Sequence, residues 1–204
     1  MTPHPTALDL NGILAKGWVD RGDIPAAEFD RAERFYTAMR VHDARLLAVR
    51  AQASALIAQW TGHSSRDVGS FGTRLNLENS DLDLGIGEPV DHRPALMAAL
   101  DGRARFLGER RTSLSTTRLV FAFDVDGVEI DLSAFTTDDF ALAGRMLDQI
   151  DEAMTPSERI CHTWVKHLLH EASRLKDYAA WKLVTYARFC PEFNWVPSPE
   201  KAGS

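Results

Sequence analysis

Apolar residues along the first 60 positions recur every three or four residues, which is the spacing of helices that bury one face. This spacing predicts a short helix over residues 8–16. It then predicts one long helix or two stacked helices over residues 29–60, which we expect to pack against a sheet. Asp23 is expected to cap the start of this helical region, with Pro25 in its first turn, and Gly62 is expected to end it.

From residue 68 onward the pattern shortens to the period of two that is typical of strands. Residues 118–124 and 128–133 each place three apolar side chains on one face, and the Asp-Gly dipeptide at 126–127 predicts a tight turn between them. The same alternation in residues 81–84, Asp-Leu-Asp-Leu, puts two leucines on one face of a strand and two carboxylates on the other.

Helical spacing returns in residues 93–100 and again after the last predicted strand. There Asp138 or Asp139 is expected to cap one helix, and Thr155 is expected to cap the next. A last helix is predicted over residues 176–189.

These elements predict an α/β fold, with a small mixed sheet flanked by helices and a C-terminal helical bundle. We assign residues 1–134 to a core with N-terminal helices, and residues 135–204 to a helical region that closes a cleft. Of the 204 residues, 45% are hydrophobic and 25% are charged, as in globular proteins with a substantial core. The net charge of -6 argues against a broad nucleic-acid footprint. No apolar run reaches membrane-spanning length and no signal peptide is visible, so we expect a cytoplasmic protein.

Residues 68–87 carry the most informative chemistry in the sequence. Gly69 and Ser70 lie at a predicted strand-to-helix turn, where close backbone approach and exposed N–H groups favour phosphate. Further along, Asp81 and Asp83 face one side of a strand and would repel each other without a cation between them. Hard oxygen ligands of this kind suit Mg²⁺, which is often shared with substrate phosphates. The two features together predict a metal–triphosphate site.

This stretch resembles the signature of the DNA polymerase beta-like nucleotidyltransferases, and most closely that of the terminal uridylyl- and adenylyltransferases. Their segment reads Gly-Ser-x-x-Thr-Gly-Leu, followed by Ser-Asp-x-Asp. Here the sequence reads Gly-Ser-Phe-Gly-Thr-Arg-Leu at 69–75 and Ser-Asp-Leu-Asp at 80–83. It departs at Arg74, where the family often has glycine; an arginine there either contacts phosphate or faces water. The resemblance extends over residues 68–134.

The resemblance also implies further site residues. The family has a third carboxylate on a later strand, and Asp131 stands in the matching context Val-x-Ile-Asp-Leu-Ser. Residues 163–167 and 178–187 resemble two helical segments of the tailing enzymes and oligoadenylate synthases that lie near the nucleotide. Nucleotide-binding roles for Lys166 and Lys182 are therefore implied, although lysines on helices often just face water.

The activity implied by the resemblance is transfer of a nucleoside monophosphate from an NTP to an acceptor, with release of pyrophosphate. Asp81, Asp83 and Asp131 would hold two Mg²⁺ ions, with Mn²⁺ as a substitute. Gly69 and Ser70 would bind the phosphates. We prefer a small-molecule acceptor, because the chain is short, acidic and without a recognisable RNA-binding module. The alternative is RNA 3′-end or tRNA nucleotidyl transfer.

Simpler interpretations exist for the same residues. Asp81 as a turn residue, Asp83 as a solvated strand acid and Asp131 as half of a surface ion pair would need no metal, although Asp is depleted in strands. The arginines within residues 103–118 fit an edge strand protected by charge, and equally a contact to phosphates or an anionic acceptor. A catalytically silent binding module is disfavoured because all three carboxylates are present.

Overall fold

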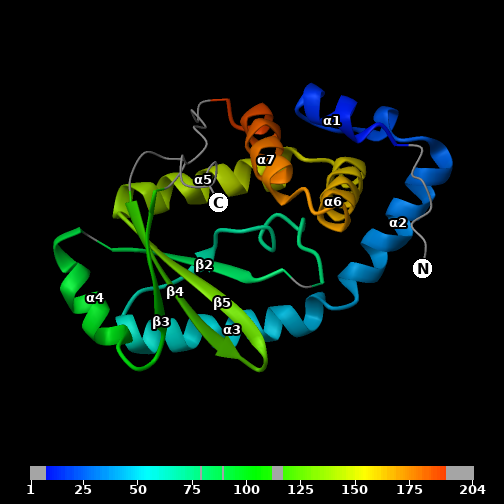
Figure 1. Cartoon of the computed structure of the whole chain (residues 1–204). Helices are drawn as coiled ribbons and strands as arrows, with labels where there is room; N and C mark the ends of the chain where they lie inside the picture. The colour runs from blue at the N-terminus through cyan, green and yellow to red at the C-terminus, as the bar shows by residue number, and fades with distance from the viewer. Residues whose placement is uncertain (1–7, 79, 89, 112–116, 192–204) are drawn as a thin grey trace.

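The computed structural model describes residues 8–78, 80–88, 90–111 and 117–191 (Figure 1). The predicted α/β class is confirmed, with a five-stranded sheet flanked by helices. The helices are α1 (Leu10–Lys16), α2 (Ala26–Arg40), α3 (Asp43–Thr61), α4 (Arg93–Leu100), α5 (Thr137–Ala153), α6 (Pro156–Glu171) and α7 (Leu175–Phe189), with short 3₁₀ turns at Arg21–Asp23 and Val90–His92. The strands are β1 (Arg66–Asp67), β2 (Leu82–Gly87), β3 (Arg105–Arg111), β4 (Thr117–Val125) and β5 (Val128–Phe135).

The strands lie in the order β1-β2-β5-β4-β3. β2 and β5 run parallel, whereas the other neighbouring pairs are antiparallel. β4 and β5 form the predicted hairpin. Asp126 and Gly127 at its turn have φ values of 51° and 76°, and the mirror-image turns favoured in hairpins require such positive values. A bulge between Phe106 and Gly108 shifts the register of β3 against β4.

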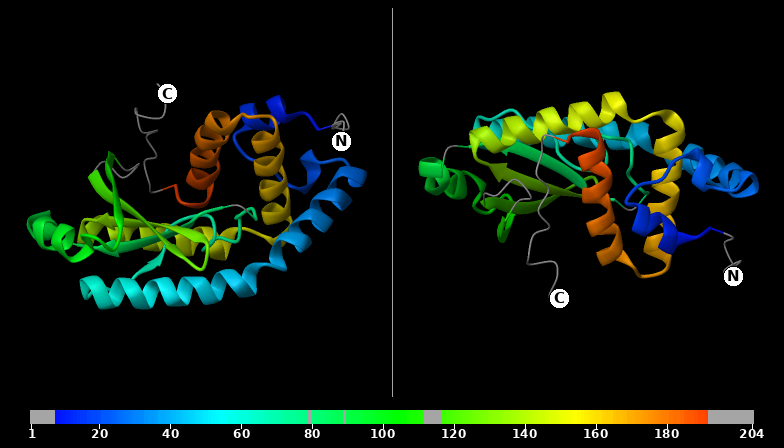
Figure 2. Two further views of the ribbon diagram at one scale, coloured as in Figure 1. Left: turned by 60° about the horizontal axis from the view of Figure 1, so that its bottom comes forward. Right: turned by 90° about the horizontal axis from the view of Figure 1, so that it is seen from above.

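Alternation along the strands gives the sheet an apolar face and a carboxylate face. The apolar face packs on α3 and α4, and its buried side chains include Leu82, Leu84, Ile86, Leu119, Phe121, Ile130 and Leu132 with Ala53, Ile57, Leu96 and Leu100 from the helices. The opposite face carries Asp83 and Asp131. Figure 2 shows α3 along one side of the sheet, with α6 and α7 on the other.

The N-terminal helical region consists of two helices, and only the second packs on the sheet. α2 lies against α6 instead, so the expectation that all of residues 29–60 would cover the sheet is wrong for α2. Inside this contact the Trp164 indole donates a hydrogen bond to the buried carboxylate of Glu28 at 3.0 Å. The buried Glu28 carboxylate of α2 therefore needs a hydrogen-bond donor, which α6 supplies and the apolar side chains of the strands could not.

The predicted helix ends are confirmed at two places and wrong at two others. Asp23 lies in the preceding 3₁₀ turn, and the N-cap of α2 is Pro25, with no side-chain hydrogen bond. Gly62 ends α3 in a left-handed conformation, and Thr155 caps α6. The N-cap of α5 is Thr136 rather than Asp138 or Asp139, and its hydroxyl accepts from the Asp139 amide at 3.2 Å. A threonine at the strand end reaches the first free amides before either aspartate can. Within the described ranges, no helix combines the length and apolar character that crossing a membrane requires.

Candidate active site

Parallel pairing of β2 with β5 brings two of the three predicted carboxylates side by side. Asp83 and Asp131 are register partners, on strands that lie about 4.8 Å apart. Asp81 lies just before β2, close enough for the charge of Asp83 to act on it. Asp83 and Asp131 are half-buried, whereas Asp81 is exposed. Residues from two distant parts of the sequence therefore meet at one point of the sheet.

Asp81 and Asp131 are both harder to ionise than an ordinary aspartate, in part because of the charge of Asp83. Burial raises the pKa of Asp131, and the charges of Asp83 and Asp81 raise it further. The pKa of Asp81 is also raised, by burial first and then by the charges of Asp83 and Glu129. Asp131 Oδ1 is buried, with no hydrogen-bond partner among the described residues. A bound cation would relieve this repulsion and satisfy that oxygen.

The donors fit Mg²⁺ held partly by substrate rather than by a closed protein cage. Among the residues that the structure describes, no three His, Cys, Asp or Glu side chains gather closely enough to hold a metal ion by themselves. Mg²⁺ commonly binds through one or two carboxylates together with substrate phosphates and water. Asp83 and Asp131, with Asp81 beside them, supply hard oxygen donors of that kind.

Gly69 brings the backbone of the predicted phosphate-binding turn directly onto Asp83. A Cβ atom added at Gly69 would collide with the Asp83 carboxyl group, so a larger residue would displace that carboxylate. The neighbouring amide of Val68 donates to the Asp83 carbonyl oxygen at 2.9 Å. Ser70 follows in the turn, where its own carbonyl oxygen accepts from the Leu75 amide at 2.8 Å. The phosphate-binding role of Gly69 and Ser70 remains a prediction, and their position beside the carboxylates suits it.

Helices that are far apart in the sequence hold the loop that follows, residues 69–78, which we call the Gly-Ser loop. Side chains of α2 and α6 donate hydrogen bonds to four consecutive carbonyl oxygens of this loop. The bonds run from Arg159 to Thr73, from Tyr36 and Arg40 to Arg74 (3.3 and 3.2 Å), from Lys166 to Leu75 (3.0 Å) and from Arg40 to Asn76 (2.8 Å). N-terminal and C-terminal helices together therefore fix the loop beside the carboxylates.

The two lysines implied by the resemblance both lie near Tyr178. The Nζ atoms of Lys166 and Lys182 are 5.6 and 5.9 Å from the centroid of its ring. Lys166 Nζ also lies 3.4 Å from Ser80 Oγ, next in sequence to Asp81. Burial, followed by the charge of Lys182, lowers the pKa of Lys166 to about 7. A phosphate beside Lys166 would favour its charged form, so the position suits a triphosphate.

The backbone conformation at Arg74 is one that glycine adopts easily, which explains the glycine that the related signature has at this position. The Arg74 backbone is left-handed, with a φ of 58°, and this conformation costs a residue with a Cβ atom roughly 1 kcal/mol. The side chain is exposed, while the carbonyl oxygen is held by Tyr36 and Arg40. The hydrogen bonds from α2 thus hold the strained conformation. The family glycine was the only sequence signal of this strain.

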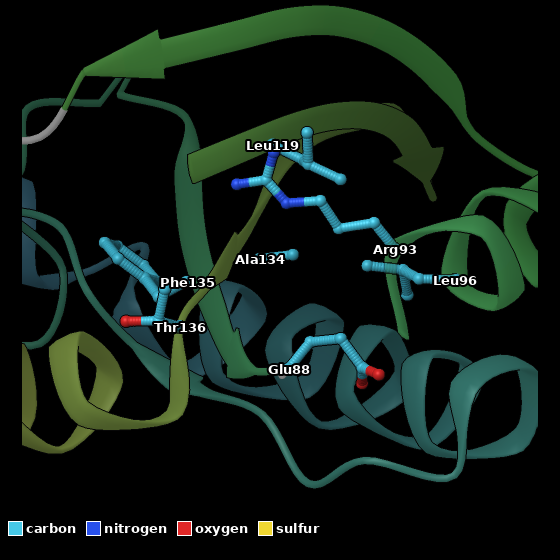
Figure 3. Close-up of a pocket in the computed structure, with 7 residues that line it drawn as sticks. All are labelled: Glu88, Arg93, Leu96, Leu119, Ala134, Phe135 and Thr136. Carbon is cyan, nitrogen blue, oxygen red and sulfur yellow. The ribbon is translucent and has the colours of Figure 1, made fainter. Parts of the chain in front are cut away.

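A separate small pocket lies at the far end of β2 (Figure 3). Glu88 and Arg93 line it among mainly apolar neighbours. The Glu88 carboxylate is buried and pairs with His63 and, at 3.2 Å, with His92. The space holds no more than about one water molecule, so this corner supports the fold rather than a substrate.

Comparison with known proteins finds similarity in the fold alone. No protein-family model and no curated protein matches the chain. The solved structure of a GLD-2/RNP-8 complex matches at 14% sequence identity with a TM-score of 0.51, over 83% of this chain and 68% of that chain. A cytoplasmic RNA terminal U-transferase matches at 13% identity with a TM-score of 0.50. Cid1, described by its RNA terminal uridylyl transferase activity, matches at 13% identity with a TM-score of 0.51.

The last two matches each cover 71% of this chain and 47% of the other, so the chain spans about half the length of these uridylyl transferases. Their fold is that of the DNA polymerase beta-like nucleotidyltransferases. The resemblance seen in the sequence is therefore confirmed for the fold, on whose sheet Asp83 and Asp131 lie side by side.

The left-handed backbone at Arg74 predicts that Arg74→Gly stabilises the protein. The gain should be up to about 0.5 kcal/mol, because the entropy that glycine adds to the unfolded chain offsets part of the strain relieved. Urea denaturation measures it as a raised midpoint at an unchanged slope. Arg34→Gly, at an exposed position within helix α2, is the matched control and should lose about 1 kcal/mol. A similar loss at Arg74 would contradict the strain.

Repulsion among the carboxylates predicts that Asp131→Asn stabilises the ligand-free protein near neutral pH. Because folding raises the pKa of Asp131, its contribution to stability is lost as pH rises above the ordinary aspartate range, about 3.9. The advantage of asparagine should therefore be small near pH 4 and grow towards pH 7. Thermal melts across this range measure it, with Asp30→Asn on the exposed face of α2 as the control. A variant less stable at every pH would show that the carboxylate is structural.

Proposed function

We propose that this protein transfers a nucleoside monophosphate from an NTP to the 3′-hydroxyl of an RNA and releases pyrophosphate. The observation that carries the proposal is the pairing of Asp83 with Asp131, with the Gly69 backbone pressed against Asp83. Mutually repelling carboxylates beside a phosphate-sized turn suit a metal-bound triphosphate. The solved structures with the same fold include an RNA terminal U-transferase, which supports the choice of reaction.

The chain's own residues would bind and orient the nucleotide. Gly69 and Ser70 present backbone and hydroxyl groups to the phosphates, and Lys166 and Lys182 neutralise them from the helical side. Asp81, Asp83 and Asp131 would hold Mg²⁺, which when bound neutralises phosphate charge and lowers the pKa of the attacking hydroxyl. Positioning and charge neutralisation supply most of the rate in phosphoryl transfer.

We assign to Asp131 the role of accepting the proton that the acceptor hydroxyl loses. The acceptor oxygen forms a bond to the α-phosphorus while the bond from that phosphorus to the bridging oxygen breaks, and pyrophosphate leaves. The hydroxyl proton passes to the Asp131 carboxylate. Burial and the neighbouring acids raise the pKa of Asp131 in the ligand-free protein, and bound Mg²⁺ would oppose that shift, so the carboxylate would be ionised and able to accept the proton.

The proposed RNA acceptor differs from the small-molecule acceptor that the sequence led us to prefer. Length and acidity favoured a small molecule, but two of the matched structures are named for terminal uridylyl transfer to RNA. An acidic net charge is also compatible with RNA binding if cationic side chains gather locally at the site. We therefore favour RNA, and a small molecule becomes an outcome of the test.

The test is incubation of the protein with each labelled NTP and Mg²⁺, with a short oligoribonucleotide or a metabolite extract as the acceptor. We expect label in lengthened RNA for the wild type. Asp83→Ala should lower turnover at least about a hundredfold, and the exposed Asp101→Asn, in the turn after α4, should not.

Each alternative result has a defined meaning. Label in a small molecule but not in RNA would overturn the RNA acceptor and leave nucleotidyl transfer standing. Release of no pyrophosphate with any NTP would overturn the transferase, as would full activity in Asp83→Ala.

A further inference from the structure

Two arginines lie opposite each other on the carboxylate face of the sheet. Arg110 of β3 and Arg118 of β4 are register partners. Asp131 pairs with Ala122 on β4, and residues four apart on a strand share a face, so Arg118 lies on the same face as Asp131. Like charges directly opposite each other on neighbouring strands are destabilising. An anion bound between the two guanidinium groups would remove that penalty.

Nearby arginines have carboxylate partners, whereas this pair has none within the described residues. Arg93 pairs with Glu109 at 3.2 Å, and Arg105 pairs with Glu129 at 3.7 Å. These ion pairs account for Arg93 and Arg105 as parts of the fold. Arg110 and Arg118 form no such ion pair among the described residues, although their charges and those of Asp83 and Asp131 act on one another.

Arg118 is also held in a fixed position. It is half-buried, and its guanidinium lies 5.4 Å from the centroid of the Phe135 ring. Its Nε atom is buried and makes no hydrogen bond to a described residue. Burial lowers the pKa of Arg118, while the charges of Asp83 and Asp131 act in the opposite direction, which places all three in one electrostatic site. A fixed guanidinium with a free buried donor suits a phosphate oxygen.

The pair lies across the carboxylates from the predicted triphosphate site. In the sheet, the Gly-Ser loop adjoins β2, the carboxylates belong to β2 and β5, and the arginines belong to β4 and β3. Along the strands, Arg118 lies over Phe135 at the end of β5, whereas Lys166 contacts Ser80 ahead of β2. Two phosphate-bearing ligands bound at these places would approach each other at Asp131.

We propose that Arg110 and Arg118 bind the last phosphodiester of the RNA acceptor and so place its 3′-hydroxyl at Asp131. The proposal rests on the proposed function for RNA as the acceptor. Arg118 contacts the phosphate from the floor of the site, and Arg110 contacts it from the edge strand. The pair supplies local positive charge on a protein whose net charge is -6.

The test measures RNA binding without NTP, so that it does not depend on catalysis. The probe is a fluorescent single-stranded oligoribonucleotide, followed by anisotropy at several salt concentrations. Arg110→Ala, at an exposed position, should bind about tenfold more weakly and lower the salt slope by about 0.7, the value for one lost phosphate contact. Arg118→Gln is the second variant. Arg111→Ala is the matched control, because Arg111 is exposed next along β3 and pairs with Thr117 on the opposite face.

A neutral linkage locates the contact on the RNA. An oligoribonucleotide with a methylphosphonate at its last linkage should bind the wild type about tenfold more weakly. The double variant Arg110→Ala/Arg118→Gln should bind this probe and the ordinary probe equally, since both contacts to that linkage are already lost. A neutral linkage elsewhere in the chain should weaken the wild type and the variant alike.

The other results would overturn the proposal. Equal RNA binding by the wild type and both variants would do so, as would an equal loss in Arg111→Ala. Weaker NTP binding in the variants, with RNA binding intact, would place the arginines on the nucleotide instead. The RNA-binding test and the transfer assay are independent. The protein could bind RNA through these arginines and transfer no nucleotide, or transfer nucleotide without this RNA contact, and the two experiments tell these cases apart.

Discussion

Repulsion between carboxylates on two parallel strands is the constraint around which this structure is arranged. Asp83 and Asp131 are paired by the register of β2 and β5, and Asp81 adds a third charge beside them. The apolar side chains on the reverse of the same strands fix that register, because a slip of one residue would turn every buried leucine and isoleucine outward. The core thus holds together a charge cluster that is costly without a cation.

The Gly-Ser loop depends on the same constraint and adds the helices to it. Gly69 packs directly on Asp83, and hydrogen bonds from α2 and α6 fix the carbonyl oxygens that follow. The contact of α2 with α6, rather than with the sheet, allows one loop to be held from both ends of the chain. The same hydrogen bonds hold Arg74 in its strained left-handed conformation.

Local patterns predicted the strands, the hairpin turn and the acidic pair, because alternation and an Asp-Gly dipeptide are each visible within a few residues. The partner of α2 was not predictable in this way, since a buried glutamate and an indole on distant helices leave no local signature. The arginines of β3 could not be sorted by simple alternation either. The bulge between Phe106 and Gly108 shifts the pattern, so that Arg110 rather than Arg111 joins the carboxylate face.

We propose that the carboxylates form a site for a metal-bound triphosphate. Calorimetric titration with a non-hydrolysable NTP, with Mg²⁺ and then with a chelator, tests it most directly. We expect the wild type to bind the NTP only when Mg²⁺ is present, and Asp83→Asn to lose this metal dependence together with most of the affinity. Equal affinity of the wild type with Mg²⁺ and with the chelator would contradict it.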